Sequence, residues 1–279
     1  MILIDGKKLS QEILSKIKIE IDNLPFQPVF CDVLVGEDKV SAQYVNMKSR
    51  RAASVGILFH NANFSSSITT NELIEEIKKL NKIPHMCGII IQLPLPSHIN
   101  AELALNAVDS ELDVDCLGDK AGEKFYAGDT TVGFPTALAC LELIDSLNLN
   151  LKDKNIVVLG QGNLVGKPVT ALFRFQGLSP IVIRSKTENK EEFIKQADII
   201  VSGMGKGKYI TGEMIKTGAI LIDAGTSESG SGIVGDVDLD SVKNVALYVS
   251  PVPGGVGPMT VAMLLKNVLT VAKRQIGLD

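Results

Sequence analysis

The feature that most constrains the fold is an alternation, along the whole chain, of short β-branched runs with longer amphipathic segments. The clearest run is Val29–Val35, and a helical pattern over 39–55 follows it. Such alternation is typical of βαβ units built around parallel sheets. It predicts further strands near 57–61, 87–92, 155–159, 181–184, 199–202, 220–223 and 246–250. It also predicts helices near 8–23, 69–81, 100–108, 136–147 and 260–275, and the fold class is therefore α/β.

The length of the chain indicates more than one lobe. Its 279 residues exceed the usual size of one compact domain. The stretch 118–133, which contains glycine, aspartate and threonine, is the best candidate for an irregular connection. We therefore expect one lobe over 1–138 and a second over 139–259, with a terminal helix over 260–279 that packs back on the first.

Composition and charge limit the classes of partner. Hydrophobic residues make up 45% and charged residues 22%, which matches an ordinary soluble globular protein. A net charge of −4 gives no general attraction to nucleic acid or to an anionic membrane. The N-terminus turns polar after four residues, and no apolar run reaches the length of a membrane span. We expect a cytoplasmic protein.

Neither the cysteines nor the histidines show the spacing of metal ligands. The cysteines lack a Cys-x-x-Cys pair and lie mostly in apolar stretches, so reduced packing residues are favoured over ligands or disulfides. The histidines form no recognisable ligand pattern, and we expect no metal site. These residues are Cys31, Cys87, Cys116 and Cys140, with His60, His85 and His98.

A glycine-rich turn follows the buried-strand pattern at 156–159. Gly160, Gly162 and Gly166 stand in the order Gly-x-Gly-x-x-x-Gly, which lets a backbone approach a pyrophosphate at a helix N-terminus. A merely tight turn is the alternative. At the tip of the next strand, Arg184, Ser185 and Lys186 stand where an NAD enzyme usually carries an acid. The basic and hydroxyl groups favour NADP over NAD, although a solvated strand end would have the same composition.

A lysine-bearing helical segment supplies candidate reactive groups. At about 100° per residue, Ser41, Tyr44 and Lys48 fall on one stripe. A partly desolvated lysine can exchange protons with a substrate, whereas a solvated lysine in a basic run with Arg50 and Arg51 is the alternative. An apolar stripe expected to hold this helix against a sheet comprises Ala42, Val45, Ala52 and Ala53.

Three irregular segments are expected near a ligand-binding site. Gln92 ends a continuous apolar strand and precedes two prolines, so it would project at the carboxyl end of a sheet, where α/β proteins hold ligands. Its alternative role is a hydrogen bond to backbone. Asp113-Val114-Asp115 lies in the irregular connection, and the proline- and glycine-rich segment 250–260 predicts a rigid loop after a strand.

Taken together, these stretches resemble the methylenetetrahydrofolate dehydrogenase/cyclohydrolase family over nearly the full length. The resemblance implies an N-terminal α/β substrate lobe, a C-terminal Rossmann-type dinucleotide-binding lobe, a cleft between them and a homodimer through the nucleotide lobe. It also implies oxidation of 5,10-methylenetetrahydrofolate with NADP, and hydrolysis of the methenyl product to 10-formyltetrahydrofolate. The matching segments are Val35-Gly36 with Ser41, Tyr44 and Lys48; 92–96; 113–115; 165–168; and 251–260.

The resemblance also implies residue roles. Tyr44 would stack on the folate, Lys48 would be the catalytic acid/base, Gln92 would tune Lys48, and Asp115 would grip the pterin ring. Ser41 would contact substrate, and the loop bearing Pro251, Gly254 and Gly255 would line the folate side. The cofactor is expected to contact Gly160, Gln161, Gly162, Val165, Arg184, Ser185, Thr226 and Thr260.

Several positions depart from the family pattern. Leu112 replaces a lysine, and Cys116 replaces a glycine, which would add strain if that position requires positive φ. The segment 134–137 also differs. Gln161 stands where relatives commonly have arginine, and we hypothesise that Arg184, in place of a histidine, restores the missing cation. Two alternative functions remain. One is another two-lobed dehydrogenase of the shikimate or amino-acid type, and the other is a non-catalytic NADP- or folate-binding regulator.

Overall fold

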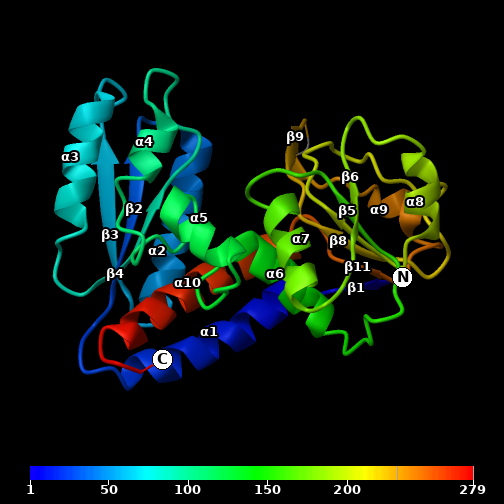
Figure 1. Cartoon of the computed structure of the whole chain (residues 1–279), viewed down its shortest axis with the longest axis horizontal. Coiled ribbons are helices and arrows are strands. Elements are labelled where there is room, and N and C mark those ends of the chain that lie inside the picture. Colours follow the sequence, from blue (N-terminus) through cyan, green and yellow to red (C-terminus); the bar gives the residue numbers. More distant parts are fainter. Residues whose placement is uncertain (231, 279) are drawn as a thin grey trace. The chain divides into compact units, whose positions relative to one another are not determined.

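The computed structural model describes residues 1–230 and 232–278, which form two compact units (Figure 1). The six-stranded unit contains Met1–Gln11 and Thr136–Met263. The three-stranded unit contains Glu12–Pro135 and the chain from Leu264 onward. Two helices, α1 (Gly6–Asp22) and α10 (Val256–Arg274), have residues in both units.

The six-stranded unit is built on a parallel sheet. Its strand order is β1-β11-β8-β7-β5-β6, so β5 has β6 on one side and β7 on the other. A doubly wound sheet binds ligands where the strand order reverses, which here is the carboxyl end of β5 and β7. The sheet strands are β1 (Ile2–Leu3), β5 (Ile156–Leu159), β6 (Ile181–Ile183), β7 (Ile199–Ser202), β8 (Ile220–Asp223) and β11 (Tyr248–Val249). The other elements are α6 (Pro135–Asp145), α7 (Gly166–Phe175), α8 (Lys190–Gln196), α9 (Leu239–Val242) and the antiparallel pair β9 (Ser227–Ser229) and β10 (Gly232–Val234).

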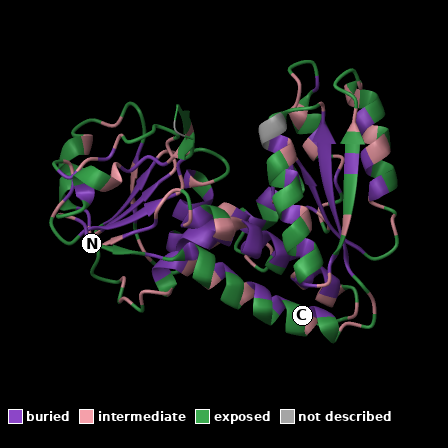
Figure 2. Ribbon diagram, turned by 180° about the vertical axis from the view of Figure 1, so that it is seen from behind, coloured by how far each residue is buried: buried purple, intermediate pink, exposed green. Residues whose placement is uncertain are grey.

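The three-stranded unit has the parallel order β3-β2-β4. One face of β2 packs against α3 and α4 in an apolar core, while α2 packs against β2 and β3. The central strand β2 is buried along its whole length, whereas β3 at the edge is mostly exposed (Figure 2). The elements are β2 (Val29–Val35), α2 (Lys39–Ser54), β3 (Leu58–Phe64), α3 (Thr70–Leu80), β4 (Met86–Ile91), α4 (Ala101–Leu105) and α5 (Asp119–Tyr126).

The structure confirms the α/β class and differs from the expected organisation at two places. The connection expected to be irregular over 118–133 contains α5, whose Gly122 is buried against the Cys116 carbonyl. The first residues group with the six-stranded unit, because Ile2 and Leu3 pair with Tyr248 and Val249 of β11. The expected first lobe, 1–138 with the helix 260–279, therefore differs from the observed unit in its first eleven residues, in 136–138 and in 260–263.

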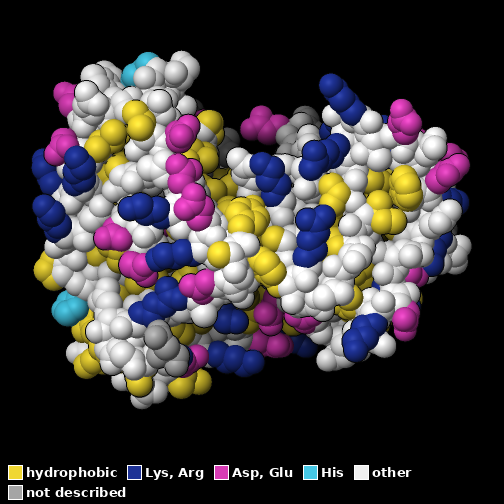
Figure 3. Space-filling model, in the orientation of Figure 1, with side chains coloured by type: hydrophobic (Ala, Val, Ile, Leu, Met, Phe, Trp, Pro, Cys, Tyr) yellow, Lys and Arg dark blue, Asp and Glu magenta, His cyan; other side chains and the backbone are white. Residues whose placement is uncertain are grey.

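Within the described residues, no helix combines the length and apolarity that crossing a bilayer requires. On the face shown in Figure 3, lysine and arginine side chains are interspersed with aspartate and glutamate. This mixture agrees with the modest net charge of −4.

Candidate functional site

Helix α2 buries its candidate lysine in the seam that faces the sheet. Asp38 caps the helix, because its carboxylate accepts a hydrogen bond of 2.7 Å from the Ser41 amide. Lys48 is only 7% exposed, so it is not the solvated lysine considered as an alternative. The buried seam of α2 consists of Ser41, Val45, Lys48 and Ala52.

Of the apolar stripe predicted on α2, only half of the residues are buried. Val45 and Ala52 are buried, but Ala42 is half-buried and Ala53 is exposed. Positions 42 and 53 lie about 100° from the centre of the seam, since each residue turns the helix by about that angle. Tyr44 lies nearer the seam and is 36% exposed, which leaves its ring accessible.

The Lys48 amine lies between an amide and a carboxylate. Its Nζ donates to Gln92 Oε1 at 2.8 Å and forms an ion pair with Asp32 Oδ2 at 2.7 Å. Gln92 follows β4, its backbone amide donates to the Val33 carbonyl, and its Nε2 donates to the Leu93 carbonyl at 3.2 Å. The second donation fixes the side chain with its oxygen toward Lys48. The predicted partnership of Gln92 and Lys48 is therefore present.

A loop beside β4 brings Asp115 into the electrostatic range of this amine. Asp113 is 6% exposed and holds the loop, because its carboxylate accepts from the Gly118 amide at 2.7 Å and from the Asp115 amide at 3.2 Å. Asp115 is half-buried. The pKa of Asp115 is raised to about 7, mainly by burial and also by the charges of Asp113 and Asp32, while the charge of Lys48 lowers it. Asp115 can therefore change protonation near neutral pH.

At two positions of the glycine-rich turn between β5 and α7, there is no room for a side chain. Gly160 has a φ of +90°, and a Cβ there would lie 2.7 Å from the Gly203 carbonyl oxygen. A Cβ on Gly166 would lie 2.1 Å from the Gly160 carbonyl oxygen. Gly162, in contrast, is exposed, and a Cβ on it would meet no atom within 4 Å. The turn thus presents bare backbone at the N-terminus of α7, at the point where the strand order reverses.

Comparison with known proteins matches both parts of the chain to one family. The catalytic-domain model of tetrahydrofolate dehydrogenase/cyclohydrolase matches residues 4–115, and the NAD(P)-binding-domain model of that family matches residues 135–276. The chain belongs to the tetrahydrofolate dehydrogenase/cyclohydrolase family.

Its relatives in this family resemble it over their full length. The bifunctional protein FolD of Nitratiruptor sp. is 41% identical over 99% of each chain. The crystal structure of the bifunctional methylenetetrahydrofolate dehydrogenase/cyclohydrolase of Campylobacter jejuni is 34% identical, with a TM-score of 0.95 and 99% of each chain covered. The Trypanosoma brucei dehydrogenase-cyclohydrolase, solved with NADP and an inhibitor, is 32% identical, with a TM-score of 0.93 and the same coverage.

In this family member, the predicted cofactor residues all lie in the six-stranded unit. Arg184 and Ser185 are exposed beyond β6, where the Arg184 amide donates to Thr187 Oγ1 at 2.8 Å. Gln161 is directed inward, because its Nε2 donates to the Gly160 carbonyl at 2.8 Å and to Thr170 Oγ1 at 3.2 Å. Val165 occupies the N-cap position of α7, Thr226 is exposed, and Thr260 lies on α10, where its hydroxyl donates to the Val256 carbonyl.

The predicted rigid loop of this family member follows β11. The Gly255 amide donates to the Pro251 carbonyl at 2.7 Å, and Gly254 has a φ of +114°. A Cβ on Gly6 would lie 2.0 Å from the Gly255 carbonyl oxygen, so the loop lies directly against the start of α1. Pro251 and Gly254 remain half-buried, and Gly255 is buried.

Two buried carboxylates brace the loops of the six-stranded unit and were missed by sequence reasoning. Asp236 accepts from Ser202 Oγ at 2.6 Å and from the Met204 and Lys206 amides at 2.8 and 2.6 Å. Asp223 accepts from the amides of residues 225, 236 and 237. Burial is the main cause that raises the pKa of Asp223 to about 6. The segment Gly235-Asp236-Val237-Asp238 repeats the small-and-acidic pattern of 113–115 and could have signalled Asp236.

The four cysteines are free and buried. In the described part of the chain, histidine, cysteine and acidic side chains form no group of three or more that could hold a metal ion.

Two further residues of the three-stranded unit were missed. Asp32 had a visible signal, because it is a charged residue inside the apolar strand Val29–Val35. Asn267 had no such signal, and its Nδ2 donates to the Val114 carbonyl at 2.8 Å and the Gly133 carbonyl at 2.7 Å. Asn267 thereby holds both ends of the segment that carries Asp115.

Proposed function

We propose that this chain is a bifunctional enzyme of one-carbon metabolism. It oxidises 5,10-methylenetetrahydrofolate to 5,10-methenyltetrahydrofolate with NADP, and it hydrolyses the methenyl compound to 10-formyltetrahydrofolate. The observation that carries the proposal is the Lys48 amine, which is 7% exposed and bonded to Gln92 at the carboxyl end of β4. The protein is a cytoplasmic homodimer with neither nucleic acid nor membrane among its partners, in keeping with its modest net charge.

The residues of the six-stranded unit fit a dinucleotide. Gly160 and Gly166 keep the turn closely packed, and the exposed Gly162 leaves bare backbone before the N-terminus of α7, so a pyrophosphate would be held there. The exposed guanidinium of Arg184 and hydroxyl of Ser185 would hold the 2′-phosphate of NADP, because no acid stands at that strand end. Gln161 stabilises the turn, and the exposed Thr226, together with Val165 and Thr260, would complete the contacts. Bound NADP supplies the acceptor for the hydride that leaves the methylene carbon.

The three-stranded unit binds and converts the folate. Tyr44 offers an accessible ring for stacking, Ser41 and Asp115 contact the substrate, and Asp115 hydrogen-bonds the pterin. These groups align the one-carbon bridge and exclude competing water.

Lys48 moves the protons of ring opening. Water adds to the methenyl carbon and releases one proton to solvent. The Lys48 ammonium then gives a proton to N5 as the bond between N5 and that carbon breaks. The resulting amine takes the proton of the new hydroxyl group, whose oxygen becomes the formyl oxygen. Gln92 holds the amine in position throughout, and Lys48 ends as the ammonium with which it began.

The decisive experiment separates the two reactions. Purified protein is given methylenetetrahydrofolate with NADP or NAD, and nicotinamide reduction and methenyl absorbance are recorded independently. We expect turnover with NADP, followed by decay of the methenyl signal. Binding of NADP without any turnover would instead support a non-catalytic regulator.

The lysine is tested by Lys48→Met. Loss of general acid–base catalysis should lower cyclohydrolase turnover by about 100-fold or more, while NADP binding survives. Lys18→Met, which removes an exposed lysine paired with Asp22, is the matched control and should behave as the wild type. Cyclohydrolase activity at the wild-type rate in Lys48→Met would refute the assignment.

A further inference from the structure

A carboxylate lies beneath the catalytic lysine, inside the central strand of the sheet. Asp32 is in the middle of β2 and is 0% exposed. Its neighbours Cys31 and Val33 point into the apolar core formed with α3, so Asp32 points to the opposite face. On that face its Oδ2 lies 2.7 Å from Lys48 Nζ. The carboxylate is therefore enclosed between the sheet and α2.

Lys48 is the partner on which Asp32 depends. Apart from that amine, no hydrogen-bond donor reaches either carboxyl oxygen of Asp32 among the described residues. Asp113, in contrast, is held by backbone amides. Burial raises the pKa of Asp32, and the charge of Lys48 is the main influence that lowers it. The ionised form of Asp32 therefore depends on Lys48.

Stability alone does not account for this pair. Removing two charges from water costs about as much as their attraction returns, and an apolar pair of similar volume is often as stable or more so. Burying the Asp32 charge in an otherwise apolar strand therefore does not stabilise the fold. Its presence is better explained by an effect on the reactivity of Lys48. Among the other titratable groups, Asp115 interacts electrostatically with Lys48, and Asp113 interacts in turn with Asp115. Tyr44 lies one turn before Lys48 on α2.

We infer that Asp32 is a positioning residue for ring opening, which holds the Lys48 amine protonated and against Gln92 and so sets the pH range of the cyclohydrolase reaction. The inference rests on the proposed function. An ammonium that begins the step as proton donor needs a negative charge close by, and Asp32 supplies one that solvent does not screen. Asp115 does not replace it, because no ion pair or hydrogen bond joins Asp115 to Lys48 among the described residues, whereas Asp32 lies 2.7 Å from the amine.

The test is Asp32→Asn, which removes the charge and keeps the shape. Methenyltetrahydrofolate is added directly, and the cyclohydrolase kcat is measured against pH. Without the carboxylate the ammonium loses its proton at lower pH, so the alkaline midpoint of the profile should move down by at least about one pH unit. The KM for the folate should change by less than about threefold, since Asp32 is fully buried beneath Lys48.

Val33→Ala is the matched control. It weakens the same strand from the other face without altering a charge, and its alkaline midpoint should stay at the wild-type value. An unmoved midpoint in Asp32→Asn would overturn the inference, provided that the wild type is active. A wild type without cyclohydrolase activity would instead refute the proposed function.

A second set of variants covers the case in which Asp32→Asn does not fold. Asp32→Leu leaves the buried ammonium unpaired, whereas Asp32→Leu with Lys48→Met removes both charges. We expect the double variant to unfold at a higher denaturant concentration than Asp32→Leu alone. Equal midpoints for Asp32→Leu and wild type would contradict a role for Asp32 in pairing the amine.

Discussion

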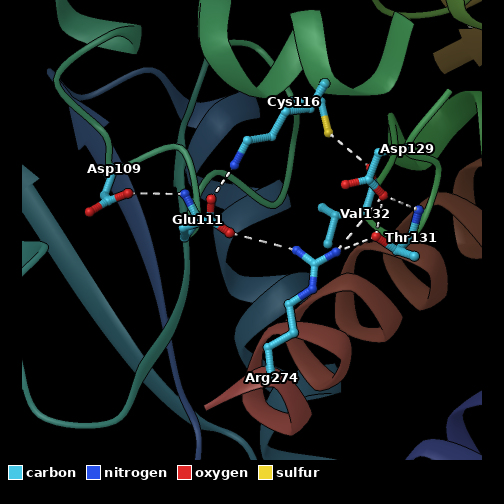
Figure 4. A network of polar contacts seen from close by, with 8 residues as sticks. Asp109, Glu111, Cys116, Asp129, Thr131, Val132 and Arg274 are labelled. Carbon is cyan, nitrogen blue, oxygen red and sulfur yellow. Dashed lines mark hydrogen bonds and ion pairs between the residues drawn. The ribbon is translucent and has the colours of Figure 1, made fainter. Parts of the chain in front are cut away.

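Cys116 occupies a backbone conformation that suits glycine. Its φ is 58°, and its side chain is 2% exposed, with Sγ directed at the Val132 carbonyl 3.7 Å away (Figure 4). The strain anticipated from the family's glycine at this position is therefore present. Nearby, Arg274 lies between Glu111 and Asp129 at 3.8 and 3.9 Å, so surrounding ion pairs help to hold the loop (Figure 4).

The strain at Cys116 can be measured with two substitutions. Cys116→Ala keeps a Cβ at positive φ, whereas Cys116→Gly removes it. We expect the glycine variant to be more stable than the alanine variant by about 1 kcal/mol, because left-handed backbone costs a residue with a side chain about that much. The free energies of unfolding in urea provide the measurement.

The same pair of substitutions at Cys140 is the control. Cys140 is a buried residue of α6, where glycine should be less stable than alanine by about 1 kcal/mol. The same order of stability at both sites would show that Cys116 carries no strain.

The turn between β5 and α7 is the element whose geometry is most restricted. In Gly166→Ala the new methyl group would meet the Gly160 carbonyl oxygen, so either the helix or the turn must move. We expect a loss of roughly 2 kcal/mol or more in the free energy of unfolding, in the range of overpacked sites. Gly162→Ala meets no atom within 4 Å and should change it by less than about 1 kcal/mol. Both values are measured without cofactor, and equal losses would contradict the close approach.

Elements with continuous patterns were predictable, and contacts between distant elements were not. Strand β2 was predicted at its observed limits because its apolar run is unbroken except for Asp32. Helix α5 was missed because Gly118 and Gly122 are poor helix formers, and its stability comes from burial of Phe125 and its neighbours. The pairing of Gln92 with Lys48 was expected from family resemblance, whereas the pairing of Asp32 with Lys48 depends on how α2 packs on the sheet. Periodicity alone does not report that packing.

At the scale of the whole molecule, the chain passes between its two units several times. The boundaries follow Gln11 inside α1 and Met263 inside α10, so each of these helices contributes residues to both units. If one half of such a helix unfolds, the other half becomes less stable, because helix formation is cooperative. We therefore expect the two units to unfold in one transition.

Asn267→Ala tests this expectation from one end. Asn267 is 2% exposed and belongs to the three-stranded unit, where its removal leaves the Val114 and Gly133 carbonyls without that donor. The cost should be roughly 2–4 kcal/mol for two buried acceptors. Thr270→Ala, on the same helix, removes one bond to the Lys266 carbonyl and serves as the control, with a cost below about 1 kcal/mol.

Hydrogen exchange gives the measurement, because the slowest amides of a strand report the free energy of global unfolding. If the units unfold together, the slowest amides of β4 in one unit and β5 in the other should lose protection by the same free energy in Asn267→Ala. A loss confined to β4, with β5 as protected as in the wild type, would mean that the units unfold separately. In that case α1 and α10, which have residues in both units, would not couple the stability of one unit to that of the other.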